Sequence, residues 1–199
     1  FDTTYDWTIL MEIGGPRTDG AAKIALESLL ENAFEDGLVI DAVLPQSEDQ
    51  RAQIWFLREA IVEAQVREGA QVKHDVSVPV SQVPRFIREA NAAVEEMMPG
   101  IRPYPFGHVG DGNIHYNLSQ PIDMPAREFL GRYAELQHRV HDVALSLDGS
   151  ISAEHGIGRS KRDELLRCKS AVELDMMRSL KTLFDPKGLM NPGKTIPDA

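Results

Sequence analysis

The chain has 199 residues, of which 42% are hydrophobic and 26% charged, and its formal net charge is −10. These proportions are typical of a globular domain with a sizeable core, and the negative charge argues against a nucleic-acid or anionic-membrane surface. The single Cys168 excludes an internal disulfide and fits a reducing compartment. An anionic substrate would therefore need a local cationic pocket.

In the first half of the chain, apolar residues recur alternately with the periods of strands and of helices. The expected strands are 7–13, 38–44 and 72–78. The expected helices are 21–34, one from a cap at Ser47 to about 68, and one from a cap at Ser81 to about 98. On pattern alone, this alternation would allow a parallel doubly wound sheet.

The second half favours a different fold class. It predicts a hairpin over 101–109 and 113–118, a long helix over 126–147, helices over 161–168 and 171–184, and a loop from 185 onward. A hairpin followed by a helical C-terminal third is typical of an α+β fold. We therefore expect an α+β fold.

The hairpin carries the first candidate site. Asp111-Gly112 between two β-prone runs predicts a two-residue type I′ turn, which places His108 directly opposite His115. Imidazoles opposite each other have Cβ atoms only ~5 Å apart, close enough to bind one ion. Strand alternation gives this polar face Phe106, His108, Asn113, His115 and Asn117. It turns a second set toward the core, namely Val109, Ile114, Tyr116 and Leu118.

A second cluster lies in the glycine-rich stretch from Ser152 to Arg159, which contains Glu154 and His155. Two histidines and one carboxylate form a recurrent metal site that leaves positions open for water or substrate. Neighbouring side chains in an extended chain point apart, so Glu154 and His155 should not both bind the same ion. We assign Glu154 to the metal with His108 and His115, and expect Zn²⁺ or a similar divalent ion.

Three stretches also carry a family resemblance. They are His108-Val-Gly-Asp-Gly-Asn-Ile-His115, Ser152-Ala-Glu-His-Gly-Ile-Gly158 and Phe184-Asp-Pro-Lys-Gly-Leu-Met-Asn-Pro-Gly-Lys194. In this order they resemble the C-terminal portion of FAD-linked oxidases, flavoenzymes of the vanillyl-alcohol-oxidase type. These enzymes oxidise D-2-hydroxy acids such as D-2-hydroxyglutarate, D-lactate and glycolate. The resemblance also implies an α+β fold with an antiparallel sheet covered by helices, with ferredoxin-like elements. The resemblance spans residues 1–199 and implies that a flavin-binding domain precedes Phe1, so that the chain alone is an inactive fragment.

The resemblance also implies roles for individual residues. Arg58 and Lys73 match the basic residues that bind the substrate carboxylate, whereas Val62 stands where the hydroxyglutarate branch has a hydroxyl side chain. Val62 therefore favours smaller or more apolar 2-hydroxy acids. His155 would take the hydroxyl proton, because imidazole titrates near the working pH.

The cofactor-facing residues implied by the resemblance are Asn113 and Asn191, while Asn117 would orient the substrate. The hydride would pass to FAD, and from there electrons would pass to an electron-transfer protein or a quinone. The resemblance leaves a homodimer open. It places the protein in the bacterial cytoplasm or, in a eukaryote, in the mitochondrial matrix.

Two other functions fit the same residues. A metal-dependent hydrolase could use the two-histidine, one-glutamate site to activate water, and a non-catalytic module could bind a small acid beside a structural ion. The stretch from Phe184 to Lys194 favours the oxidase, since a hydrolase has no evident use for it.

Overall fold

The computed structural model describes residues 3–15 and 20–196, which fall into two compact units, Phe1–Ala64 and Gln65–Ala199. In the first unit, the predicted helices are confirmed as α1 (Ala21–Glu35) and α2 (Glu48–Val66). The hydroxyl of Ser47 accepts the N–H of Gln50 at 3.2 Å, as expected for a helix cap.

The two strands predicted in the first unit are wrong. Residues 7–13 and 38–44 have no strand pairing, and most of their apolar side chains are exposed, with Trp7 at 63% and Ile40 at 82%. Alternation of apolar residues records a preference for a pleated surface, but a strand exists only where a partner edge supplies hydrogen bonds. The first of these segments is held to α2 instead, where the indole of Trp55 donates to Glu12 at 2.8 Å.

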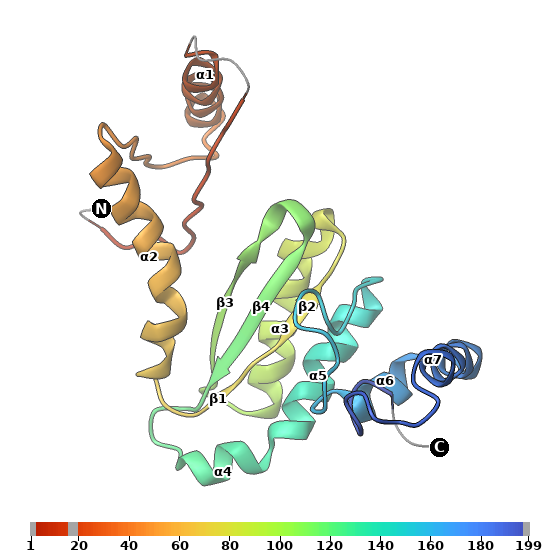
Figure 1. Cartoon of the computed structure of the whole chain (residues 1–199). Helices are drawn as coiled ribbons and strands as arrows, with labels where there is room; N and C mark the ends of the chain where they lie inside the picture. Colours follow the sequence, from red (N-terminus) through yellow and green to blue (C-terminus); the bar gives the residue numbers. More distant parts are fainter. Residues whose placement is uncertain (1–2, 16–19, 197–199) are drawn as a thin grey trace. The chain divides into compact units, whose positions relative to one another are not determined.

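The second unit is built on an antiparallel sheet, which confirms the α+β class (Figure 1). Its strands are β1 (Gln71–Val72), β2 (Asp75–Ser77), β3 (Arg102–His108) and β4 (Asn113–Ser119). The central strand β4 pairs with β3 on one side and with β1 and β2 on the other. The single strand predicted over 72–78 is thus interrupted, at a point where His74 hydrogen-bonds the carbonyl oxygen of Tyr116 through Nδ1 at 2.6 Å.

The hairpin register differs from the prediction. His108 lies opposite Asn113, and Phe106 lies opposite His115, so four residues rather than two connect the strands. They form a 3₁₀ turn over Val109–Asp111, closed by a left-handed Gly112. The carboxylate of Asp111 accepts the N–H of Asn113 at 3.0 Å, and this local bond stabilises the longer turn. His108 and His115 therefore share a face as diagonal rather than opposite neighbours.

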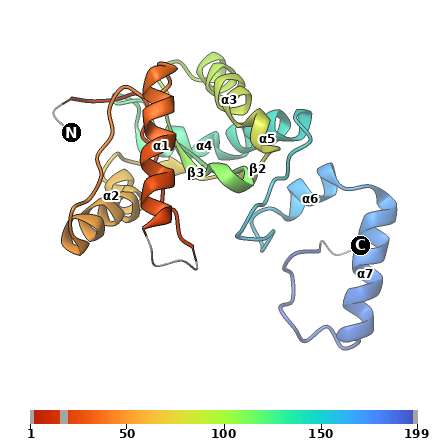
Figure 2. The same cartoon turned by 90° about the horizontal axis from the view of Figure 1, so that it is seen from above.

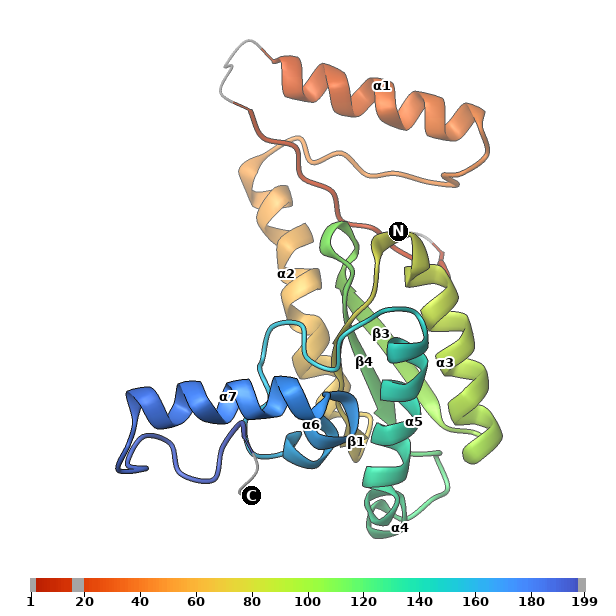
Figure 3. The same cartoon turned by 90° about the vertical axis from the view of Figure 1, so that its right-hand side faces the viewer.

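One face of the sheet is covered by α3 (Val83–Met97) and α5 (Tyr133–Ser146), as Figures 1 and 3 show. Ile114, Tyr116 and Leu118 point into this core as predicted, with exposures of 2% or less. Val109 is 54% exposed, contrary to the prediction, because it belongs to the turn.

The helix predicted over 126–147 is two helices, α4 (Ala126–Gly131) and α5. Gly131 weakens the helix at the break, and the guanidinium of Arg132 donates to the carbonyl oxygen of Met97 at 2.7 Å. Ser81 does not cap α3, since it lies inside a 3₁₀ turn over Val80–Gln82.

The C-terminal helices are confirmed as α6 (Arg162–Cys168) and α7 (Ala171–Phe184). Both lie beyond the β2 edge of the sheet (Figure 2). A capping box on Ser170 and Glu173 fixes the start of α7. Across the described residues, every helix is too short or too polar to cross a membrane.

Candidate active site

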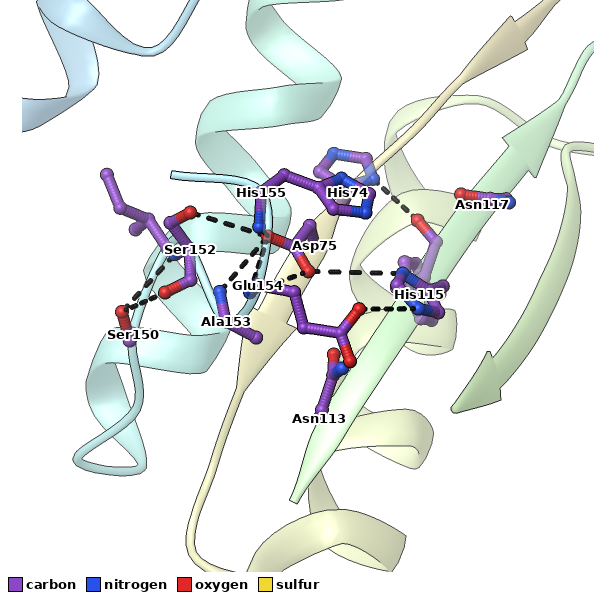
Figure 4. Close-up of polar contacts among 12 residues, drawn as sticks. His74, Asp75, Asn113, His115, Asn117, Ser150, Ser152, Ala153, Glu154 and His155 are labelled. Carbon is purple, nitrogen blue, oxygen red and sulfur yellow. Dashed lines mark hydrogen bonds and ion pairs between the residues drawn. The ribbon is translucent and has the colours of Figure 1, made fainter. Parts of the chain in front are cut away.

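The face of the sheet opposite α3 and α5 carries polar side chains from two neighbouring strands. Asn113, His115 and Asn117 of β4 lie on this face, as predicted from strand alternation. The strand β2 adds Asp75 directly opposite His115 and Ser77 directly opposite Asn113. Figure 4 shows Asp75 between His115 and the loop that holds Glu154.

Asp75 binds this loop through its carboxylate. Its Oδ2 accepts the backbone N–H groups of Ala153 at 3.1 Å, Glu154 at 3.1 Å and His155 at 2.9 Å. The hydroxyl of Ser152 donates to the same oxygen at 3.3 Å. Four donors on one oxygen hold the second cluster of the sequence against the first (Figure 4).

Lys161 completes this anchor. Its buried ammonium donates to the carbonyl oxygen of Ile151 at 2.8 Å and lies 3.7 Å from Asp75 Oδ2. Burial by itself would raise the pKa of Asp75, but the amides of His155 and Glu154, with Lys161, outweigh it and hold that pKa below its usual range. Burial lowers the pKa of Lys161, and Asp75 opposes that shift.

Sequence reasoning missed Asp75 and Lys161. A signal for Asp75 was present, because it is a charged residue inside the apolar run 72–78, and acidic residues are almost never fully buried unless they are paired. Its partners follow about eighty positions later in the sequence, and no local pattern identifies them.

His115 lies between two carboxylates. Its Nε2 is 3.7 Å from Oε2 of Glu154, and its Nδ1 is 3.9 Å from Oδ1 of Asp75. Two donors that each lie about 2.1 Å from one Zn²⁺ in a tetrahedral site are roughly 3.4 Å apart. The Nε2–Oε2 pair is therefore close to the spacing of two ligands of one ion.

His155 stacks on His115, with ring centroids 5.4 Å apart and planes inclined by 24°. Donor atoms of Asp75, His115 and His155 lie within 4.8 Å of one another and form a second candidate set for an ion. An imidazole binds a metal through a lone pair in its ring plane, however, and the lone pairs of stacked rings lie in nearly parallel planes. Nearly parallel ring planes do not favour a common ligand position, so we rank this set below the pair of His115 and Glu154.

The structure therefore brings His115, Glu154 and His155 together. His108 is exposed at the end of β3 and is absent from the set of described donor groups close enough to share an ion. Asn113 is 3% exposed, and among the described residues neither atom of its amide group has a hydrogen-bond partner.

Asn117 is already engaged within the fold. Its amide N–H donates to Oε1 of Gln65 at 2.7 Å, and the Gln65 amide donates in turn to the carbonyl oxygen of Tyr104 at 3.4 Å. Of the two predicted carboxylate-binding residues, the half-buried Arg58 belongs to the first unit and the exposed Lys73 to the second.

The third motif is organised by Asp185, which is 7% exposed. Its two carboxylate oxygens accept the N–H groups of Leu189 and Met190, each at 2.8 Å, and Lys181 also contacts it. Asn191 follows with a left-handed φ of 48°. The turn at the end of α7 is thus built by one buried carboxylate.

This C-terminal loop contacts the glycine-rich loop of the second motif. The N–H of Thr195 donates to the carbonyl oxygen of Gly158 at 2.7 Å, and Arg162 donates to the carbonyl oxygen of Gly193 at 3.1 Å. The second and third motifs therefore lie side by side in the fold, as do the first and second.

Comparison with known proteins identifies the family. A family model described as FAD linked oxidases, C-terminal domain, matches residues 1–195. A D-2-hydroxyglutarate dehydrogenase of Stutzerimonas stutzeri is 41% identical over 194 residues, which cover 98% of this chain and 41% of the relative. Mitochondrial D-2-hydroxyglutarate dehydrogenases of Arabidopsis thaliana and Rattus norvegicus are 36% and 34% identical, covering 98% and 95% of this chain.

The chain spans about two fifths of the length of the Stutzerimonas relative and about a third of the other two, at 33% and 34%. The resemblance drawn from the three motifs is confirmed over nearly the whole chain. The chain therefore belongs to the family described as FAD linked oxidases, C-terminal domain.

Proposed function

We propose that this chain is the substrate- and metal-binding half of an FAD-dependent oxidoreductase that converts a D-2-hydroxy acid into the 2-oxo acid. The observation that carries the proposal is the meeting of His115, Glu154 and His155 on the polar face of β4. The names of the relatives support the reaction class. FAD, bound mainly by a domain outside this chain, would accept the C2 hydride and pass electrons to an electron-transfer protein or a quinone.

The proposed metal ligands are Glu154 Oε2 and His115 Nε2. His108 is proposed as the third from the sequence motif alone, because the described donor groups close enough to share an ion do not include it. The 3.7 Å between the first two atoms supports this assignment, and a mixed imidazole and carboxylate set suits Zn²⁺ or a similar divalent ion. When bound, such an ion would lower the pKa of the substrate's 2-hydroxyl.

His155 is proposed as the general base. It is proposed to lie outside the ligand set, but it stacks on His115 and is therefore next to the proposed metal position. The imidazole would take the hydroxyl proton while the C2 hydride leaves for the flavin, so the products are the 2-oxo acid, reduced flavin and one proton.

Five further residues are proposed to position the reactants. Arg58 and Lys73 would bind the substrate carboxylate, and Asn117 would orient the substrate. Asn113 and Asn191 would face the flavin. A buried amide without partners is costly, so the unpartnered Asn113 supports the presence of a ligand at that position.

Two observations bear on the identity of the acid. The relatives are named for D-2-hydroxyglutarate, a dicarboxylate. Val62, one helical turn after Arg58, cannot hydrogen-bond a second carboxylate and favours a short monocarboxylate such as D-lactate. The comparison of these two substrates is therefore the first assay.

The two rival functions are less well supported. A metal-dependent hydrolase or a binding module would explain His115 and Glu154, but neither explains why the Asn191 loop is hydrogen-bonded to the glycine-rich loop. We further infer a bacterial cytoplasmic or mitochondrial matrix location. The eukaryotic relatives are named mitochondrial, and the bacterial alternative rests on the family resemblance alone. A homodimer is compatible with this function.

The proposal is tested in the flavin-loaded enzyme that contains this chain. Glu154→Ala should lose bound metal, measured by elemental analysis, whereas His155→Ala should keep it. His155→Ala should also reduce flavin roughly a hundredfold more slowly with D-2-hydroxy acids, the usual size of a lost general base.

The matched control is Ser160→Ala, a change at an exposed position immediately after the glycine-rich loop. It should retain both metal and turnover. If His155→Ala loses the metal while Glu154→Ala retains it, the two roles are exchanged. Hydrolysis without any flavin reduction would favour the hydrolase.

A further inference from the structure

Asp75 is the most deeply buried carboxylate on the polar face of the sheet, and the proposed chemistry does not use it. It is 2% exposed and lies directly opposite His115 on the neighbouring strand. Burying an ionised carboxylate is costly unless donors surround it. Asp75 has such donors at the centre of the site, so its carboxylate must have a role there.

The two oxygens of Asp75 have different surroundings. Oδ2 accepts the N–H groups of Ala153, Glu154 and His155, so it is committed to the loop. Oδ1 faces Nδ1 of His115 at 3.9 Å and accepts only one longer bond from the loop, from the Glu154 N–H at 3.3 Å. The carboxylate of Asp75 thus faces both the loop that carries Glu154 and the imidazole of His115.

A direct metal-binding role for Asp75 does not fit these contacts. An ion shared by Asp75 Oδ1 and His115 would require Nδ1 of the imidazole as ligand. Nε2, the nitrogen that faces Glu154 at 3.7 Å, would then be left out. Histidines that bind a metal through one nitrogen almost always donate the other N–H to a carboxylate. His115 is oriented for that arrangement, because its Nε2 faces Glu154 and its Nδ1 faces Oδ1 of Asp75 at 3.9 Å, a separation longer than a direct hydrogen bond.

We propose that Asp75 is the positioning residue of this site. One carboxylate oxygen anchors the loop that carries Glu154 and His155, and the other selects the Nδ1–H tautomer of His115, which makes Nε2 the metal-binding nitrogen. The consequence for the metal rests on the proposed function, whereas the loop anchor and the tautomer are properties of the chain itself.

The test compares Asp75→Asn and Asp75→Ala in the full 199-residue chain. With ¹⁵N-labelled protein above the pKa of histidine, NMR long-range correlations identify the protonated ring nitrogen of His115. The wild-type chain should carry the proton on Nδ1. In Asp75→Asn, the carbonyl oxygen can still accept the loop amides, which turns the amide NH₂ toward His115 Nδ1, so the proton should move to Nε2.

Asp75→Ala should release the loop. Hydrogen exchange at the amides of Ala153, Glu154 and His155 should accelerate at least tenfold, because a hydrogen bond to a charged group contributes about 1.5–3 kcal/mol. Zn²⁺ affinity of both variants should fall about 10–100-fold, the usual effect of removing an outer partner of a ligand. In the flavin-loaded enzyme, the same variants should lower kcat more than they raise KM.

The matched control is Glu164→Gln, which changes another carboxylate that is 2% exposed and bonded to His141 rather than to the loop. It should leave the His115 tautomer and the exchange of residues 153–155 unchanged. Asp75→Asn carries the test even if Asp75→Ala does not fold, since it preserves shape and volume.

Two results are decisive in opposite directions. An unchanged tautomer together with unchanged loop exchange overturns the positioning role, whether or not the enzyme is active. An inverted tautomer in a protein that never binds Zn²⁺ or oxidises a hydroxy acid supports the positioning role and rejects the proposed function instead.

Discussion

The turn between β3 and β4 should tolerate alanine at one of its glycines and not at the other. Gly112 has a φ of 75°, and a β-carbon there would lie 1.9 Å from the carbonyl oxygen of Val78. The N–H of Val78 also donates to the carbonyl oxygen of Gly112 at 3.1 Å. An added methyl group must therefore separate the two backbone segments, and β2 leads directly into Val78.

The cost of Gly112→Ala follows from these contacts. Placing alanine in the left-handed region costs roughly 1–2 kcal/mol, and losing the Val78 hydrogen bond costs about 1 kcal/mol more. The free energy of unfolding should thus fall by about 2–3 kcal/mol. For a chain of this length that corresponds to a melting temperature lower by roughly 4–12 °C.

The assay is thermal unfolding followed by circular dichroism, with Gly110→Ala as the matched control in the same turn. A β-carbon on Gly110 meets no atom within 4 Å, and its backbone is outside the left-handed region. Gly110→Ala should therefore lie within about 0.5 kcal/mol of the wild type. Equal melting temperatures for the two variants would refute the reasoning.

Two other predictions concern specificity and pH. Val62→Thr, in the flavin-loaded enzyme, should raise kcat/KM for D-2-hydroxyglutarate relative to D-lactate, because threonine supplies a hydroxyl donor at this position. An unchanged ratio of the two kcat/KM values would show that Val62 does not determine the choice of substrate. Burial lowers the pKa of His74 to about 3. As the pH falls from 6.5 toward 3, this histidine is therefore protonated in the unfolded chain but stays neutral in the folded one. The free energy of unfolding should fall over that range by up to roughly 1.4 kcal/mol per pH unit. His74→Asn should flatten this dependence in urea titrations, and an unchanged slope would show that other groups cause it.

Local patterns in the sequence were sufficient for much of the second unit. The bounds of α7 follow from its capping residues and apolar period, and the alternation in β4 correctly separates His115 from Ile114 and Tyr116. These features depend on side chains within one or two turns of each other, which is the range over which sequence periodicity operates. The three motifs were likewise sufficient to identify the family.

These local patterns do not predict which distant segments pair with each other. The residues at 7–13 have strand-like alternation but no partner strand in the described structure. In the hairpin, the Asp111 side chain and the backbone contact between Gly112 and Val78 select a four-residue connection over the two-residue turn. Both outcomes depend on groups that the alternation itself does not describe.

The sequence by itself therefore identified the residues that we propose to carry the chemistry, namely His115, Glu154 and His155, because they lie in compact motifs. Only the tertiary structure placed Asp75 among them. Its carboxylate reaches the N–H of His155 across a separation of eighty residues, where chain folding alone decides which groups meet. A buried carboxylate must be surrounded by donors to remain charged. The loop amides supply these donors to Asp75, and their hydrogen bonds attach the loop to the sheet.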